Sequence, residues 1–574
     1  MNTPAFFQRS ELRAVLWRFR REFAVCMVFS ALINLLMLTP TLYMLQLFDR
    51  VMISQSLLTL GAMTLVMLFF FAVMSFSEWL RSRLLVRLGV RLDEELNSRV
   101  FNASFESQLR QFGGNPAQAF SDLTNLRQFM TGNCLFAFMD APWTPIYLAV
   151  LFMLHPWLGA LGVVFSLILV VLAWFSNRAT QAPLEKAMES SGQTTTFVQS
   201  KLRNAEVIEA MGMLGDLRRH WMSRHRNHLR LNGTASDVSA RVQALTKFVR
   251  YTQQSLALGA GALLVIEGEL TAGAMIAANV LMGRATQPLD MMVGTWKSFL
   301  GARKSFARLE ALLDRHPARP AGLVREVPRG EMRIEGLVAT APGRQLPILQ
   351  GLTADFPAGE VIGIIGPSGS GKSTLARALV GIWPFTEGRV LLDGEPIDSW
   401  DRDELGPFIG YLPQDIELFE GTIAENIARF GNIDPDKVIR ACQRAGVHDM
   451  ILRLPKGYDT PMGEAGNTLS GGQRQRIGLA RAMYGDPSVL VLDEPNSNLD
   501  EVGEAALLRA VHDLKAQGRT VFLITHRSGI LAATDRLLLL KEGEIALYGP
   551  RQQVIAAIQA SAAAAPVGTA PQPA

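Results

Sequence analysis

A glycine-rich segment, Gly366–Ser373, has the residue types and spacing that bind phosphate. It follows an apolar run, Val361–Ile365, that is typical of a buried strand, and it precedes a helix-like run that begins at Thr374. In this context glycines let backbone N–H groups turn towards phosphate oxygens, and the helix N-terminus adds positive potential. Lys372 can reach the β- and γ-phosphates, and Ser373 can place its hydroxyl on Mg²⁺. The residues expected to bind the nucleotide are Gly366, Pro367, Ser368, Gly369, Ser370, Gly371, Lys372, Ser373 and Thr374.

Two acidic residues stand at the end of another apolar run, Val489–Leu492. Asp493 suits a second contact to Mg²⁺, as the aspartate at the end of such a strand does in phosphate-loop ATPases. Glu494 follows, where a carboxylate can polarise the attacking water. The plainer interpretation of Glu494 is an ordinary acid at the end of a strand.

A third motif, Leu469–Gln473, reads LSGGQ and stands between the glycine-rich segment and the acidic pair. The three motifs in this order, ending in Thr525-His526, resemble the nucleotide-binding domain of an ATP-binding cassette (ABC) ATPase. In that family the LSGGQ segment contacts ATP held by a second copy of the domain. The resemblance therefore implies ATP, Mg²⁺, a dimer and a contact from Ser470, Gly471, Gly472 and Gln473 to the nucleotide of the partner copy.

The same resemblance assigns further roles in catalysis. Glu494 is the expected base, and His526 matches the switch histidine that orients the γ-phosphate. Gln414 matches the Q-loop glutamine, which senses Mg²⁺ and touches the membrane domain. Asp500 ends a segment like the D-loop that crosses the dimer interface, and Gly463–Gly466 resembles the X-loop of exporters. The expected metal contacts are Ser373, Gln414 and Asp493.

One position departs from the family pattern. Exporters of this type carry a tyrosine that stacks on adenine near the end of the first strand of the cassette, and Ala341 stands there. We expect Pro342 or a neighbouring apolar group to cover the ring, at a loss of about 1 kcal/mol relative to an aromatic residue. Base selectivity is therefore expected to be loose.

The composition indicates what must position these residues. The chain has 574 residues, more than the ~50–250 of a usual domain. Hydrophobic residues make up 49% and charged residues 19%, and the apolar excess lies before residue 300. The net charge is only +4, and the basic residues lie between apolar runs, which points to membrane topology rather than nucleic acid. Cys26, Cys134 and Cys442 are far apart and are expected to be buried thiols.

Six apolar runs are long enough, at about 20 residues, to cross a membrane as helices. They are Phe23–Leu47, Leu57–Phe76, Phe136–Leu154, Leu158–Phe175, Phe248–Ile266 and Leu270–Met292. The first run is longer than the ~7–15 apolar residues of a secretory signal, so it reads as an uncleaved span. The third is interrupted by Asp140, Pro142 and Pro145.

Arginines concentrate in the two long connections, after the second and fourth spans, whereas the outer loops are expected to be short: Phe48–Ser56, His155–Trp157 and Glu267–Glu269. The positive-inside bias then places both termini and the ATPase in the cytoplasm. The expected fold is an all-α six-span transmembrane domain of the type I ABC exporter kind, followed by an α/β P-loop nucleotide-binding domain. The expected boundaries are 1–302 for the membrane domain, 303–330 for a linker, 331–557 for the cassette and 558–574 for a disordered Ala/Pro-rich tail.

A membrane domain and a cassette on one chain make a half-transporter, which works as a homodimer. Three stretches resemble the protease and lipase exporters of bacterial type I secretion systems: Leu42–Val51, Asp140–Tyr147 and Gln287–Asp290. The resemblance implies a protein of the bacterial inner membrane that exports unfolded polypeptides with an uncleaved C-terminal signal, together with a periplasmic adaptor and an outer-membrane channel. Only about twenty residues precede the first span, so we expect no peptidase-like domain there.

Two other functions remain as alternatives. A lipid, drug or peptide exporter would use the same scaffold, whereas six spans argue strongly against a soluble ABC ATPase of DNA repair or translation. The basic stretch Arg218–Arg230 is more typical of a solvated helix face than of a nucleic-acid site. Asp140 either lines the translocation path or makes a helix–helix contact.

Overall fold

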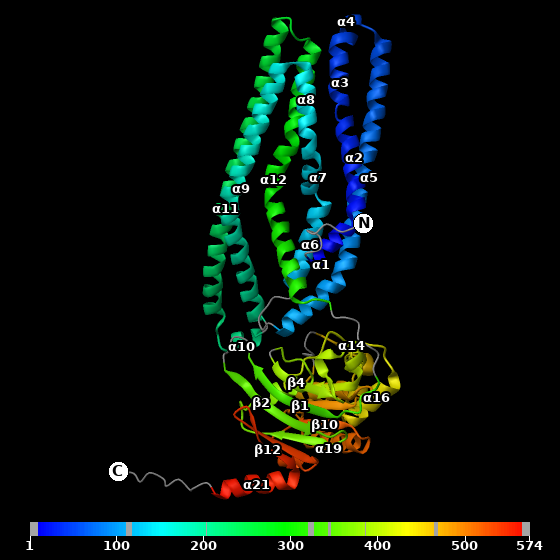
Figure 1. Ribbon diagram of the computed structural model, residues 1–574, viewed down its shortest axis with the longest axis vertical. Helices are drawn as coiled ribbons and strands as arrows, with labels where there is room; N and C mark the ends of the chain where they lie inside the picture. The colour runs from blue at the N-terminus through cyan, green and yellow to red at the C-terminus, as the bar shows by residue number, and fades with distance from the viewer. Residues whose placement is uncertain are drawn as a thin grey trace, which may run out of the picture. The chain divides into compact units, whose positions relative to one another are not determined.

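A computed structural model describes residues 10–110, 117–202, 204–318, 326–341, 346–384, 386–463 and 469–564. The chain forms two compact units, Met1–Gln108 with Gly113–Ala318, and Leu109–Phe112 with Arg319–Ala574. The first unit is helical, whereas the second combines helices with sheets (Figure 1). The predicted fold class, an all-α part followed by an α/β part, is confirmed.

The helices of the first unit are mostly long and follow one another closely. They are α1 (Glu11–Arg18), α2 (Arg20–Leu36), α3 (Thr39–Gln46), η1 (Leu47–Val51), α4 (Met52–Ser54), α5 (Leu57–Arg110), α6 (Ala117–Thr131), α7 (Asn133–Asp140), η2 (Ala141–Trp143), α8 (Thr144–Leu154), α9 (Pro156–Leu202), α10 (Ala205–Ala210), α11 (Leu214–Ile266) and α12 (Ala272–Arg315). In Figure 1, α9 and α11 run side by side, and α12 packs against α3, α6, α7, α8, α9 and α11.

Four helical stretches among the described residues are long and apolar enough to cross a membrane, and they contain the first four expected spans. They are Arg20–Ser54, Leu57–Arg110, Cys134–Leu154 and Pro156–Val198. The fifth and sixth expected spans lie in α11 and α12, which are helices of 53 and 44 residues. In α11, polar residues such as Gln253 and Gln254 dilute the apolar run. Length and composition therefore support four spans, and the count of six stays an expectation.

The third span is broken where the sequence predicts it. α7 ends at Asp140, a 3₁₀ turn carries Pro142, and α8 begins with Pro145 in its first turn. Proline lacks a backbone N–H and clashes with the preceding turn, so an undistorted α-helix cannot run through this segment.

The first outer connection, expected to be a loop over 48–56, is instead helical over most of its length. It contains the π-helix η1 and the short helix α4. η1 carries Asp49, whose Oδ2 accepts a hydrogen bond from the Thr271 hydroxyl at 2.6 Å and whose Oδ1 accepts one from the Gly273 N–H at 2.9 Å. Thr271 is the N-cap of α12. Asp49 therefore caps the start of α12 from a distant part of the chain.

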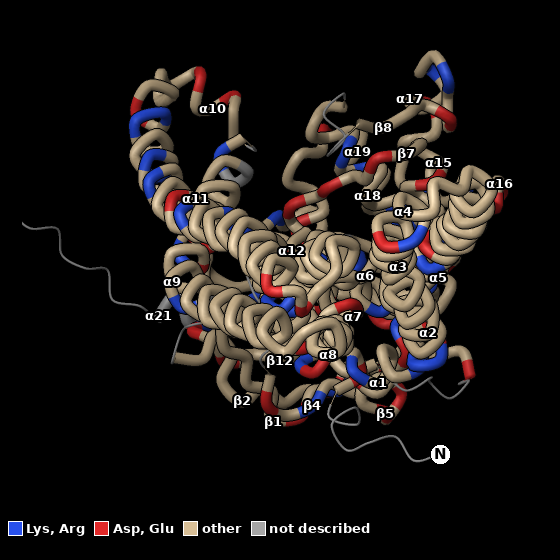
Figure 2. Tube along the Cα trace, turned by 90° about the horizontal axis from the view of Figure 1, so that it is seen from above, with Lys and Arg blue, Asp and Glu red and all other residues tan. Residues whose placement is uncertain are grey.

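The basic stretch on α11 lies along the end of that helix that leads to α10, where charged residues recur (Figure 2). Side chains of this stretch contact other side chains of the first unit. Trp221 stacks on His225 with ring centroids 4.8 Å apart, and the Arg224 guanidinium lies 4.7 Å from the Phe197 ring of α9. These contacts fit the interpretation as a solvated helix face.

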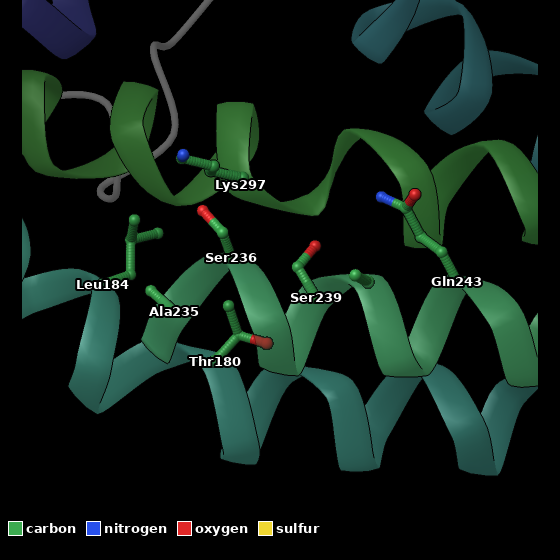
Figure 3. A pocket seen from close by; sticks show the side chains of 8 residues that line it. Thr180, Leu184, Ala235, Ser236, Ser239, Gln243 and Lys297 are labelled. Atoms are coloured by element: carbon green, nitrogen blue, oxygen red, sulfur yellow. The ribbon is translucent and has the colours of Figure 1, made fainter. Parts of the chain in front are cut away.

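A pocket of about 160 Å³ lies between α9, α11 and α12 (Figure 3). Its polar lining consists of Thr180, Ser236, Ser239, Gln243 and Lys297. The Thr180 hydroxyl is buried and has no hydrogen-bond partner among the described residues. A partly polar pocket therefore separates α9, α11 and α12 at this level, where apolar side chains alone do not fill the space between them.

Two larger sheets organise the second unit. The strands are β1 (Met332–Thr340), β2 (Pro347–Phe356), β3 (Val361–Ile365), β4 (Thr386–Leu392), β5 (Glu395–Pro396), β6 (Ile409–Leu412), β7 (Gly421–Thr422), β8 (Pro461–Met462), β9 (Val489–Asp493), β10 (Thr520–Ile524), β11 (Arg536–Lys541) and β12 (Glu544–Pro550). The six-stranded sheet has the order β12-β11-β3-β10-β9-β6 and is parallel except for β12. The antiparallel sheet has the order β2-β1-β4-β5.

The helices that carry the site pack against these sheets. They are α13 (Lys372–Leu379), α18 (Gly471–Met483) and α19 (Glu501–Ala516). Further helices and turns of this unit are η3 (Ile397–Ser399), α14 (Arg402–Leu405), η4 (Gly406–Phe408), α15 (Ile423–Ile427), α16 (Pro435–Arg444), α17 (His448–Leu452), η5 (Gly457–Asp459) and α20 (Ser528–Leu531). The runs that form β3, β9 and β10 are fully or nearly fully buried, as strands covered on both faces must be.

The last helix, α21 (Arg551–Ala564), extends past the expected start of a disordered tail at residue 558. Alanine is the best helix former, and the run from Ala556 to Ala564 is rich in it, which explains the extension. Residues 565–574 lie outside the described part of the chain. All three cysteines are buried, as expected.

Candidate nucleotide site

The glycine-rich segment joins the central strand β3 to α13, and its glycines meet specific steric demands. Gly366 has φ +153°, and a Cβ there would lie 2.1 Å from the Leu540 carbonyl oxygen. Gly371, the N-cap of α13, has φ +99°, and a Cβ there would lie 2.7 Å from the Leu349 side chain. Side chains are excluded at both positions, so the backbone of this loop stays accessible as a phosphate cradle.

The Lys372 side chain folds back onto the backbone of the glycine-rich loop. Its Nζ donates to the carbonyl oxygens of Gly366 and Pro367, both at 2.9 Å. Burial lowers the pKa of the Lys372 ammonium, while the nearby carboxylates of Glu494 and Asp493 oppose that shift. The cation of the loop and the acidic pair therefore belong to one electrostatic cluster.

Asp493 ends β9 and pairs in register with Ile524 of β10. Asp493 is only 2% exposed. Burial raises the pKa of its carboxyl group, and a hydrogen bond from Ser373 acts in the opposite direction. Its Oδ1 atom has no hydrogen-bond partner among the described residues. An unsatisfied buried carboxylate oxygen beside a serine hydroxyl fits a Mg²⁺ ion, which prefers hard oxygen ligands.

Glu494 is held in an unusual backbone conformation, with φ +49°. Its side chain accepts a hydrogen bond at Oε2 from Gln414 Nε2, at 3.2 Å. Its Oε1 lies 3.8 Å from Nε2 of His526. The fold therefore brings together the three residues expected to act in catalysis, and a non-glycine residue with positive φ is a form of strain that clusters at functional sites.

The LSGGQ segment begins α18 through a capping box. The Ser470 hydroxyl accepts from the Gln473 N–H at 3.3 Å, and Gln473 Oε1 accepts from the Ser470 N–H at 2.9 Å. A Cβ at Gly472 would lie 2.6 Å from the Asn498 carbonyl oxygen, and Gly471 faces the Asn498 side chain. The first turn of α18 is therefore ordered by its own capping box and packs against Asn498.

Asp500 connects two helices of this region. It is the N-cap of α19, where its Oδ1 accepts from the Gly503 N–H at 2.9 Å. It also pairs with Arg476 of α18 at 3.4 Å. The expected D-loop residue is thus tied to the LSGGQ helix.

Sequence reasoning missed two buried polar residues beside these motifs. Gln475, on α18, contacts the backbone of Glu494 and the side chains of Ser497 and Asn498. Asn496 accepts a hydrogen bond from the Thr525 hydroxyl at 3.0 Å. For Gln475 the available signal was a polar side chain two residues after a motif, at an inward-facing helical position, whereas Asn496 lies in a turn, where periodicity gives no signal.

Two expected features lie partly outside the described residues. Of the X-loop, only Gly463 is described. Ala341 is half-buried and follows Thr340, whose carbonyl oxygen accepts a hydrogen bond from the Trp383 indole N–H at 3.1 Å. Pro342, the residue expected to cover adenine, is not in the described part.

Comparison with known proteins agrees with this geometry over both units. Residues 349–497 match the family model "ABC transporter", and residues 23–289 match "ABC transporter transmembrane region". A type I secretion system ATP-binding protein, PrsD of Rhizobium meliloti (strain 1021), is 43% identical over 530 residues, which cover 92% of this chain and 91% of that protein.

More distant relatives and a solved structure show the same pattern. The cyclolysin secretion/processing ATP-binding protein CyaB of Bordetella pertussis is 28% identical and covers 92% of this chain and 75% of its own length. The alpha-hemolysin translocation ATP-binding protein HlyB of Escherichia coli is 29% identical, with coverages of 94% and 77%. A bacterial Atm1-family ABC exporter with ATP bound has a similar fold, with a TM-score of 0.83, 24% identity and coverages of 96% and 99%.

Proposed function

Because the chain belongs to the ABC transporter family, among the ATP-binding proteins of type I secretion systems, we propose that it exports unfolded polypeptides of the protease and lipase type that carry a C-terminal signal. Family membership itself establishes an ATP hydrolase that drives protein export and a multi-pass membrane protein. The finer substrate class is supported by the motifs Leu42–Val51, Asp140–Tyr147 and Gln287–Asp290.

The observation that carries the ATPase mechanism is the position of Glu494 between Gln414 and His526, at the carboxyl end of β9. In the proposed mechanism Glu494 orients and polarises the attacking water, and His526 contacts the γ-phosphate. Lys372 and the N–H groups of the glycine-rich loop hold the phosphates.

Three side chains would hold the metal: Ser373, Gln414 and Asp493. A Mg²⁺ ion held there would supply positive charge to the phosphate oxygens during hydrolysis. Asp493 fits this role because one of its buried oxygens lacks a partner among the described residues. Lys372 would bind the same phosphates from within the loop. The remaining requirement is to position the attacking water, which is the role proposed for Glu494.

We assign the functional unit as a homodimer with two composite sites. Ser470, Gly471, Gly472 and Gln473 would then contact ATP on the second copy, with Asp500 near the dimer interface. The capping box at Ser470 supports this role, because it orders the first turn of α18 and leaves the helix N-terminus as an anion-binding end.

In the proposed assembly the membrane domain spans residues 1–302, the linker 303–330 and the cassette 331–557, with both termini in the cytoplasm. A periplasmic adaptor and an outer-membrane channel would complete the conduit, because the short outer connections of this chain cannot cross a periplasm. The lipid bilayer and the secreted polypeptide are the remaining partners, and nothing in the charge pattern requires nucleic acid.

The proposal is tested by ATPase activity of the purified protein in lipid nanodiscs. Peptides from the C-termini of candidate secreted proteases and lipases should change the rate, whereas internal peptides of the same length and charge should not. Activation by lipids or drugs, with no response to any C-terminal peptide, would favour the alternative exporter function.

A further inference from the structure

Gln475 is the second residue after the LSGGQ motif and is only 1% exposed. Its side-chain Nε2 donates to the carbonyl oxygen of Glu494 at 3.1 Å. Its Oε1 accepts from the Asn498 Nδ2 at 3.2 Å and from the Ser497 hydroxyl at 3.4 Å. One buried amide therefore contacts three residues of the segment that follows β9.

These partners determine the orientation of the amide. Exchanging the oxygen and nitrogen of Gln475 would face its oxygen towards the Glu494 carbonyl and its NH₂ group towards the Asn498 NH₂ group. Both contacts would be repulsive, so only the observed orientation satisfies the network. A buried polar network of this kind rigidifies its members when every group is paired.

The Glu494 residue is held on both sides of its strained backbone. Its N–H donates to the Ile524 carbonyl of β10 at 3.0 Å, and its carbonyl accepts from Gln475. With φ at +49°, this conformation persists only where the surroundings impose it. β10 supplies one of these restraints and α18 supplies the other.

α18 also packs closely against Asn498 through its first turn, because a Cβ at Gly472 would lie only 2.6 Å from the Asn498 carbonyl oxygen. The helix that begins with LSGGQ is thus joined to residues 494–498 through its first turn and through Gln475. We propose that Gln475 is a positioning residue, which holds Glu494 in place for hydrolysis and links it mechanically to the LSGGQ helix. This inference rests on the proposed role of Glu494 as the catalytic base.

The test uses the full-length protein with Gln475→Met, which keeps the side-chain length and removes the amide. The kcat for ATP hydrolysis should fall about tenfold or more, while the KM for ATP changes by less than about twofold, because the phosphate contacts are untouched. Combining Gln475→Met with Asn498→Ala should lower kcat no further than the worse single variant, since both act on one network.

The chain offers a matched control. Gln253 of α11 is also 1% exposed, and its Nε2 donates to the Met282 carbonyl oxygen at 3.1 Å, far from the cassette in the chain. Gln253→Met should keep kcat within about twofold of wild type, even where its melting temperature falls as far as that of Gln475→Met.

Glu494→Gln distinguishes the positioning role of Gln475 from the catalytic role of Glu494. If Glu494→Gln stops turnover while Gln475→Met has wild-type kcat, the positioning role is wrong and the base assignment stands. If Glu494→Gln turns over normally, the base assignment itself fails. Equal loss of kcat in Gln475→Met and Gln253→Met, in step with stability, would reduce Gln475 to a structural residue.

Discussion

Arg81 of α5 donates a hydrogen bond to Oδ1 of Asp140 at the end of α7, at 3.0 Å. The same carboxylate oxygen accepts from the Asn34 amide at 2.9 Å, and Arg81 also donates to the Ser30 hydroxyl at 2.8 Å. Tyr147 completes the cluster through Asn34. Of the two roles considered for Asp140, this cluster favours the helix–helix contact over a place in an open path.

Asp140→Leu should be strongly destabilising, because it leaves the Arg81 guanidinium buried without its counter-charge. Loss of one partner of a buried ion pair costs about 3–5 kcal/mol. Arg81→Met combined with Asp140→Leu should recover most of that loss. Asp140→Asn should fall between wild type and Asp140→Leu, because its oxygen still accepts from Arg81 and Asn34 although the counter-charge is lost. Thermal unfolding in nanodiscs measures all three. A thiol at Asp140→Cys that reacts with a water-soluble reagent, in a background without native cysteines, would instead favour the path.

Glu494→Gln should bind ATP and hydrolyse it at least about a hundredfold more slowly, because the amide cannot polarise water. The substitution keeps an oxygen that can accept from Gln414, so the local structure should survive. Trapping of labelled ATP with Mg²⁺, followed by gel filtration, measures binding, and phosphate release measures turnover. Near-normal turnover would remove Glu494 from the role of base.

Asp493→Asn should raise the melting temperature of the nucleotide-free protein by about 2–4 °C, since the buried carboxylate is penalised in the folded state. The raised pKa means that protonated Asp493 favours folding, so its contribution to stability is present at low pH and is lost as pH rises through the folded-state pKa. The difference between variant and wild type should therefore shrink in acid. The extra stability that Mg²⁺-ATP confers on wild type should be lost in the variant, and its retention would argue against Asp493 as a metal ligand.

Ala341→Tyr should lower the KM for ATP about fivefold, the equivalent of about 1 kcal/mol from an aromatic ring stacked on adenine. Wild type should discriminate weakly between ATP and GTP, and the variant should discriminate more. Competition of the two nucleotides in the hydrolysis assay measures both effects. A strong ATP preference in wild type would show that another group, such as Trp383 beside Thr340, already recognises the base.

The parts of the site that could be predicted are those whose chemistry is local in sequence. The glycine-rich loop, Asp493 and Glu494 each stand at a strand end that hydrophobicity alone reveals. The contacts of Gln475 and of Arg81 could not be predicted, because they depend on which helix face meets which strand, and Arg81 and Asp140 are 59 residues apart. The expected outer loop at 48–56 was wrong for a similar reason, since helix η1 is held by Asp49 contacts to α12.

The contact between Asp49 and the start of α12 allows a test of the motif Leu42–Val51. Asp49 receives the Gly273 N–H at the positive end of α12, so Asp49→Ala should remove a cap worth about 1 kcal/mol and lower the melting temperature by about 2–4 °C. Asp49→Asn should lose less, because its amide oxygen can still accept from the Gly273 N–H while its NH₂ group can donate to the Thr271 hydroxyl. Gly273→Ala should resemble Asp49→Ala, because its added Cβ would lie 2.5 Å from the carboxylate oxygen and force the two segments apart. Basal ATPase activity should stay within about twofold of wild type in all three variants. If Asp49→Ala and Gly273→Ala unfold at the wild-type temperature, the contact between η1 and α12 contributes nothing to stability and the motif must serve another purpose.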